Sequence, residues 1–192
     1  MAGTLKTDIV QTDTIRPTSV SGTVTLGASG ETISIPSGAT FSATAGTMSG
    51  HNYPAFRAYR STSQTITNTT ITKIQFDTET FDTDSAYDNS TNYRFTPQVA
   101  GKYFFHASVR MSSFDTAVTN YQVYLYKNGS LHSRYGKESV SFASPTNSVS
   151  DIITMNGSTD YVEAFVYHNY GGDRDIAQDS VNTFFLGYRI GS

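Results

Sequence analysis

Several features that many proteins have are missing from this chain of 192 residues, and each absence excludes a class of function. The chain contains no cysteine, which excludes a disulfide framework and any thiolate metal site. No apolar run approaches the roughly 20 residues of a membrane helix, and residues 1–10 contain Lys6 and Asp8 in place of an apolar signal segment. The formal net charge of −3 gives no basic field for nucleic acid or anionic lipid. We therefore expect a soluble chain with no membrane insertion and no nucleic-acid partner.

The motifs of the common enzyme classes are also missing. The sequence has no Gly-x-Ser-x-Gly nucleophile turn and no Gly-rich phosphate loop. Its four histidines lie far apart and in no metal-binding spacing. No paired-carboxylate cleft of a polysaccharide-cleaving fibre can be argued from the sequence. We expect no catalytic residue, no bound cofactor and no enzymatic activity.

One acidic segment keeps a calcium site open as an alternative. Five carboxylates gather within it: Asp77, Glu79, Asp82, Asp84 and Asp88. Oxygen-rich loops of this kind can hold calcium, but this one lacks the spacing of an EF-hand, and solvated acidic loops are common. We assign no metal ligand here.

The residues that are abundant are typical of an all-β protein. Aromatic residues make up 13% of the chain, with 13 Tyr and 12 Phe, whereas charged residues make up only 15%. Thr, Tyr, Phe, Val and Ile favour strands. Disordered chains combine high net charge with few aromatics, so this composition indicates folded β-structure.

Residues 17–50 differ in composition from the rest of the chain, with Glu31 as their one charged residue and no Tyr. They divide into three units of eight, 23–30, 31–38 and 39–46, each of which ends in Ser-Gly or Ala-Gly. Alternating apolar residues closed by Gly predict short strands joined by tight turns. Such strands become stable by winding with copies of themselves, so we predict a β-structured stalk; a flexible Ser/Thr/Gly linker is the alternative.

A head domain is expected over residues 51–192, where aromatic strands alternate with turn signals. Asn128-Gly129 and Asn156-Gly157 lie between alternating segments, which is the strongest short signal for a hairpin. We therefore expect the strands on either side of each turn to pair. Strands at this spacing favour a sandwich or jelly roll. The expected strands are 55–61, 73–78, 93–96, 102–112, 121–127, 131–135, 149–155, 161–168 and 184–190.

Two of these strands have aromatic residues on both faces. Phe104 and Phe105 are neighbours in one strand, and Phe185 lies on the opposite face from Tyr188 in the other. A sandwich strand normally buries one face, so an apolar outer face indicates a second buried surface. We predict that four aromatic residues lie in the core or in a seam through which copies of the chain associate: Phe104, Phe105, Phe185 and Tyr188. Of these, we expect Phe104 and Phe185 on the outer faces of their strands. Scattered surface aromatics without a partner are the alternative.

The order of aromatic residues in the head resembles that of a known family. It runs through Phe76, Asp82, Tyr87, Phe95, Gly101, Tyr103 and Phe105, and closes with residues 185–190. This order is similar to that of the globular domain of complement subcomponent q, which shares its fold with tumour necrosis factor. One extra residue after Tyr87, and Ala107 at a usually aromatic position, depart from the pattern. The resemblance implies a ten-stranded jelly-roll sandwich and a homotrimer about a threefold axis.

The part before the head resembles other proteins. The collagen-like stem of that family is absent, and residues 17–50 resemble segments that precede receptor-binding or decorating heads in tailed-phage fibres. Residues 5–11 are similar to the opening of many such fibres, so we expect residues 1–16 to attach to other virion proteins. The resemblance implies a trimeric tail fibre or spike with a head that binds a host receptor. Two alternatives stay open: a capsid decoration or head-fibre protein without a specific ligand, and a secreted trimeric signalling or lectin-like module.

A loop before the last strand is the recognition candidate. It mixes an aromatic residue, a Gly pair and opposite charges, which suits contact with a host-surface receptor or glycan. Its candidate residues are Tyr170, Asp173, Arg174 and Asp175. The alternative is a plain connection in which Arg174 pairs with a neighbouring Asp.

Overall fold

The structure, a computed structural model, describes residue 37 and residues 54–112, 120–137 and 144–191. The attachment peptide expected over residues 1–16 and the stalk expected over 17–50 lie outside the described residues, except for residue 37. Both therefore stay predictions. Within the described ranges, no helix has the length and apolarity of a membrane span.

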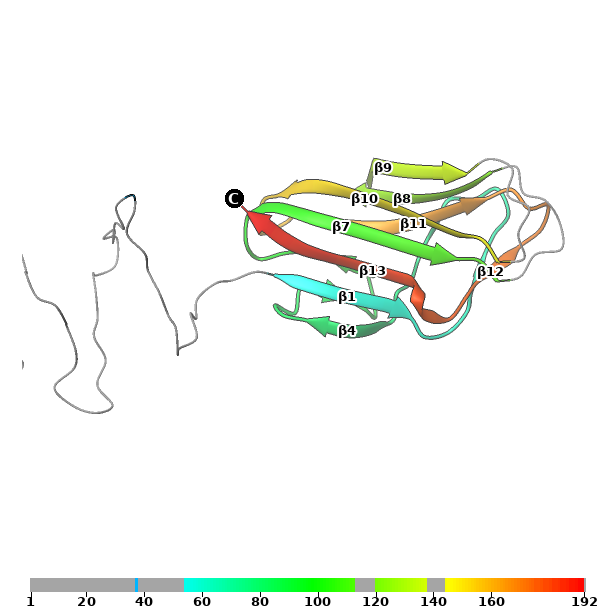
Figure 1. Cartoon of the computed structure of the whole chain (residues 1–192), viewed down its shortest axis with the longest axis horizontal. Coiled ribbons are helices and arrows are strands. Elements are labelled where there is room, and N and C mark those ends of the chain that lie inside the picture. The colour runs from blue at the N-terminus through cyan, green and yellow to red at the C-terminus, as the bar shows by residue number, and fades with distance from the viewer. Residues whose placement is uncertain (1–36, 38–53, 113–119, 138–143, 192) are drawn as a thin grey trace, which may run out of the picture. The chain divides into compact units, whose positions relative to one another are not determined.

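Thirteen strands in the described residues form two main sheets and a small ribbon (Figure 1). The first sheet has the order β10-β7-β13-β1-β4, and the second has the order β5-β6-β11-β8-β9 with β3 paired to β11. Strands β12 and β2 form the ribbon. The bounds are β1 Ala55–Arg60, β2 Gln64–Ile66, β3 Thr72–Lys73, β4 Thr78–Asp82, β5 Tyr87–Asp88, β6 Arg94–Phe95, β7 Gly101–Arg110, β8 Tyr121–Lys127, β9 Ser130–Lys137, β10 Thr146–Met155, β11 Val162–His168, β12 Arg174–Ile176 and β13 Asp179–Gly191.

The core lies between the two sheets and is built from alternate residues of each strand. On β7 the inward face includes Tyr103 and Phe105, both fully buried, as the alternation predicts. Phe56 occupies the centre, with its ring centroid 4.5 Å from that of Phe95 and 4.9 Å from that of Phe185. Large aromatic side chains of both sheets thus pack against one another in the core.

One of the two expected hairpins is confirmed, and the other is wrong. β8 and β9 pair through a two-residue turn in which Asn128 and Gly129 both have positive φ, 52° and 75°. At Asn156 the chain instead crosses from one sheet to the other, because β10 pairs with β7 and β11 pairs with β8. The Asn156 side-chain oxygen accepts hydrogen bonds from the amides of the three residues 158–160, which shapes a longer turn. Gly157 packs so tightly there that a Cβ would lie 2.2 Å from the nitrogen of Ala100.

The strand expected over residues 73–78 is split, since β3 ends at Lys73 and β4 begins at Thr78. Ile74 and Phe76 lie between them and are fully buried. The short strands β2, β5 and β12 were not expected from the sequence.

The two ends of the head lie together. β1 and β13 are antiparallel neighbours, and the amide of Arg189 donates to the carbonyl of Pro54 at 3.0 Å. At the same end, Gly101 takes a φ of +149°, and a Cβ there would lie 2.3 Å from the carbonyl oxygen of Gly191. Gly101 therefore supplies a positive φ, which residues with a side chain rarely adopt, at the start of β7.

Candidate functional site

The outer face of the first sheet exposes more apolar side chains than a sandwich normally leaves in water. In one cross-strand row, Tyr188 pairs with Phe104 and Phe104 pairs with Ile152, so the three side chains point the same way. The Phe104 and Tyr188 ring centroids are 5.5 Å apart. We call this surface the seam face: Phe81, Phe104, Ile152, Phe184, Tyr188 and Ile190. Four of its members are between 46% and 53% exposed: Phe81, Ile152, Tyr188 and Ile190.

The four residues expected at a core and seam divide evenly between the two. Phe104 and Tyr188 lie on the seam face, as expected for Phe104, whereas Phe105 and Phe185 are 0% exposed in the core. Placing Phe185 on an outer face was wrong. Gly187 sits directly opposite Phe105 in the sheet, and a Cβ there would lie 2.6 Å from the Phe105 ring. Gly187 therefore faces inward, and alternation turns Phe185 inward with it.

Polar side chains lie among the apolar residues of the seam face: Arg57 is the cross-strand neighbour of Phe81, and His106 follows Phe104 on the outer face of β7. The Arg57 guanidinium lies 4.7 Å from the Phe184 ring centroid and donates to the hydroxyl of Thr80 at 3.0 Å. Arg110 pairs with Asp179 at 3.3 Å. His106 lies 5.5 Å from the Phe184 ring, and burial lowers its pKa below the usual value. This geometry suits a protein contact that combines apolar side chains with polar groups already held in position.

The recognition loop is tied to the ribbon more firmly than expected. Tyr170 is only 6% exposed, and its ring packs 5.1 Å from that of His168. The Asp173 carboxylate accepts a hydrogen bond from the amide of Asn68 at 2.9 Å, and the Asp175 carboxylate accepts one from the hydroxyl of Thr65 at 2.7 Å. Arg174 donates to the carbonyl of Asp173. Tyr170 thus packs in the core, while contact with a receptor through the three charged residues stays a prediction.

The acidic segment uses its carboxylates to shape turns. Asp88 accepts hydrogen bonds from the amides of Thr91, Ser90 and Asn92, which hold the pKa of its carboxyl well below the usual range. Asp82 accepts hydrogen bonds from the amides of two residues in the same way. No group of three metal-ligating side chains occurs among the residues that the structure describes.

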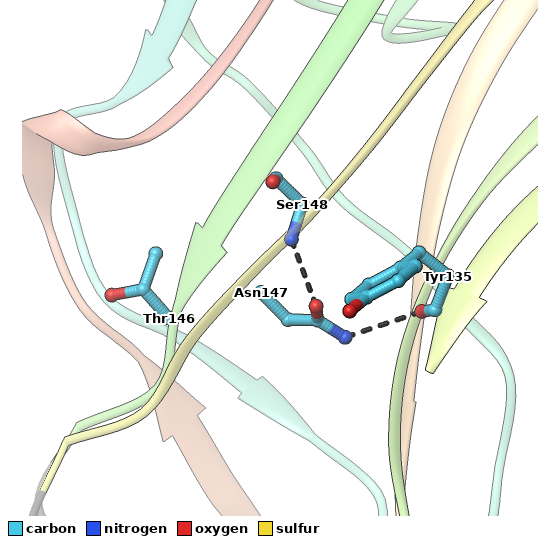
Figure 2. A pocket seen from close by; sticks show the side chains of 4 residues that line it. All are labelled: Tyr135, Thr146, Asn147 and Ser148. Carbon is cyan, nitrogen blue, oxygen red and sulfur yellow. Dashed lines mark hydrogen bonds between the residues drawn. The ribbon is translucent and has the colours of Figure 1, made fainter. Parts of the chain in front are cut away.

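A hollow of about 370 Å³ opens between β9 and β10 (Figure 2). Asn147, only 2% exposed, lies at its floor. Its amide nitrogen donates to the carbonyls of Tyr121 at 3.0 Å and Tyr135 at 3.2 Å, and its oxygen accepts from the amide of Ser148. Asn147 therefore braces one sheet against the other. Its burial could not be seen in the polar sequence Thr-Asn-Ser around it.

The comparisons with known proteins agree with this architecture. Residues 55–188 match the C1q domain. The chain belongs to the C1q domain family. The structure of murine APRIL at pH 8.0 has a TM-score of 0.56 and 8% identity, and the match covers 72% of this chain and 100% of that one. The all-β jelly roll expected from the sequence is thus confirmed.

Two further solved structures share the fold of this C1q domain. The globular domain of zebrafish complement 1qA protein has a TM-score of 0.51 and 16% identity, covering 71% of this chain and 97% of that one. Eiger TNF from S. frugiperda has a TM-score of 0.53 and 10% identity, covering 73% and 92%. No curated protein matches the chain.

Proposed function

We propose that this C1q domain is the head of a homotrimer that closes over the seam face. The observation that carries the proposal is the row formed by Ile152, Phe104 and Tyr188 on the outer face of the first sheet. Leaving such a row in water forfeits the hydrophobic stabilisation that a covered face would give. Three copies around one axis cover it with identical surfaces, and membership of the C1q domain family supports that arrangement.

We further propose that the trimer is a non-enzymatic part of a virus particle, namely a tail fibre or spike with a head that binds the host. Support comes from the sequence, where residues 17–50 and 5–11 resemble segments of tailed-phage fibres. Residues 1–16 would then join the trimer to other virion proteins. A secreted trimeric module is the second candidate, and the match to the C1q domain favours it as well.

Light scattering of the purified chain tests the assembly. A trimer has three times the 20.9 kDa mass of one chain. A stable monomer at micromolar concentration would reject the seam. Replacing Phe104 with Asp should release monomers, because a carboxylate in a closed apolar seam is left without a partner.

Antibody labelling in electron microscopy tests the location. Label at the tail tip of purified particles supports host adsorption, and label on the capsid supports decoration. Recovery of the chain from culture medium, with no label on particles, supports the secreted candidate.

A further inference from the structure

One histidine lies between the apolar residues of the seam face. His106 is half-buried on the outer face of β7, and its cross-strand neighbours are Ser150 on β10 and Leu186 on β13. The row through Phe104 runs on one side of this position, and Phe184 lies on the other side, with its ring centroid 5.5 Å from that of His106. A partner surface that covers both Phe104 and Phe184 therefore also covers His106.

The charged groups around His106 are mostly cations. Arg57 on β1 lies in the same cross-strand row, two strands away and so about 10 Å distant. Lys102 and Arg110 lie four residues away on either side, along the same face of β7. Asp179 at the start of β13 already pairs with Arg110 at 3.3 Å. The residues of β10 that share this face are uncharged: Ser148, Ser150, Ile152 and Thr154. A positive charge on His106 would therefore meet like charges on this face.

His106 becomes costly to protonate once the seam closes. Its ring has no hydrogen-bond partner among the residues that the structure describes, and the nearest group of β13 on the other side of Leu186 is the phenol of Tyr188. Burial already lowers the pKa of His106 below its usual value in the single chain. A covered seam face removes more water from the ring, which disfavours the charged form further. Closure of the seam and protonation of His106 therefore oppose each other.

We propose that His106 makes the trimer sensitive to acid, so that protonation of the three imidazoles opens the seam. This inference rests on the proposed trimer and names a way to regulate it. His106 takes up a proton more readily in the dissociated chain than in the closed seam. As the pH falls through the range in which the dissociated chain is protonated, the equilibrium therefore shifts toward monomers, whereas above that range all three rings are neutral and the seam is stable. Because three rings take up three protons, the logarithm of the dissociation constant rises by up to about three for each pH unit removed.

Sedimentation equilibrium of the full chain at neutral and acidic pH tests the switch. We expect the trimer dissociation constant of the wild type to rise at least about tenfold from pH 7.5 to pH 5.0. His106→Gln keeps a neutral polar side chain, so it should form trimers whose dissociation constant changes less than about threefold over the same range. His106→Arg places a permanent cation in the seam and should weaken the trimer already at pH 7.5. His132→Gln is the matched control and should respond like the wild type, because His132 lies on β9 in the other sheet, 3.6 Å from Asp151.

Three results would overturn the switch while leaving the trimer in place. The first is a wild-type dissociation constant that does not change with pH. The second is an equal rise in the wild type and in His106→Gln, which would assign the effect to another group. The third is a His106→Gln chain that is folded by circular dichroism but does not form trimers at pH 7.5, because the seam should accept a neutral side chain. A wild type that is monomeric at pH 7.5 would instead reject the proposed trimer itself.

Discussion

Shortening Ile152 to alanine should weaken trimer assembly while leaving the C1q domain folded. The change removes three carbon atoms, and each buried CH₂ contributes about 0.8 kcal/mol. Because 53% of Ile152 is exposed in the single chain, about half of that energy, roughly 1.2 kcal/mol per subunit, is available for assembly. Three subunits then lose about 3.6 kcal/mol, which raises the trimer dissociation constant roughly 400-fold.

Sedimentation equilibrium over a range of concentrations measures this constant. Ile71→Ala is the matched control, because Ile71 is similarly exposed, at 46%, and lies outside the seam face. We expect the control to dissociate like the wild type. Equal dissociation constants for the wild type and Ile152→Ala would refute a seam that covers this row. Equal weakening by both variants would show that the loss does not come from the seam face.

Three further predictions concern the folded domain. Gly187→Ala should lower the free energy of unfolding in urea by about 1–3 kcal/mol, because its Cβ would lie 2.6 Å from the Phe105 ring. An unfolding midpoint equal to that of the wild type would contradict this close contact between residue 187 and Phe105. Asn147→Ala should lower the free energy of unfolding by about 2–4 kcal/mol in the same assay, because the carbonyls of Tyr121 and Tyr135 lose the hydrogen bonds that Asn147 donates. A change smaller than the error of the assay would show that these hydrogen bonds do not stabilise the domain. Burial holds the pKa of His168 below its usual 6.5, so as the pH falls through 6.5 the unfolded chain takes up a proton that the folded chain does not. The free energy of unfolding should therefore decline from pH 7.5 to 5.5, and His168→Gln should make that decline shallower.

The architecture could be predicted because its determinants are local. The alternation through Tyr103 and Phe105 fixes which face of β7 is buried, and Asn128-Gly129 supplies the two positive φ angles of a hairpin turn. The same dipeptide signal failed at Asn156-Gly157. There the partners of the flanking strands are distant in sequence, and the Asn156 side-chain oxygen accepts hydrogen bonds from three amides within a longer turn.

The candidate surfaces were harder to predict because they depend on register between distant strands. Each of the two faces of β13 contains a phenylalanine, Phe184 on one and Phe185 on the other, so alternation alone does not say which one faces the core. Gly187 was the signal that decides it, since a glycine opposite Phe105 makes room for that ring. The row through Ile152, Phe104 and Tyr188 joins strands that are distant in sequence, which no local pattern reveals.

Because Pro54 and Arg189 are hydrogen-bonded neighbours, the chain enters and leaves the head at one end. A reporter fused after the last residue would emerge beside the start of the head, whereas the turn at Gly171 opens into empty space at the other end. That turn has a φ of +81° and nothing within 4 Å of an added Cβ, but the amide of Gly171 donates to the side-chain oxygen of Asn68 at 3.1 Å, so a peptide inserted there would have to preserve this bond to leave the loop in place.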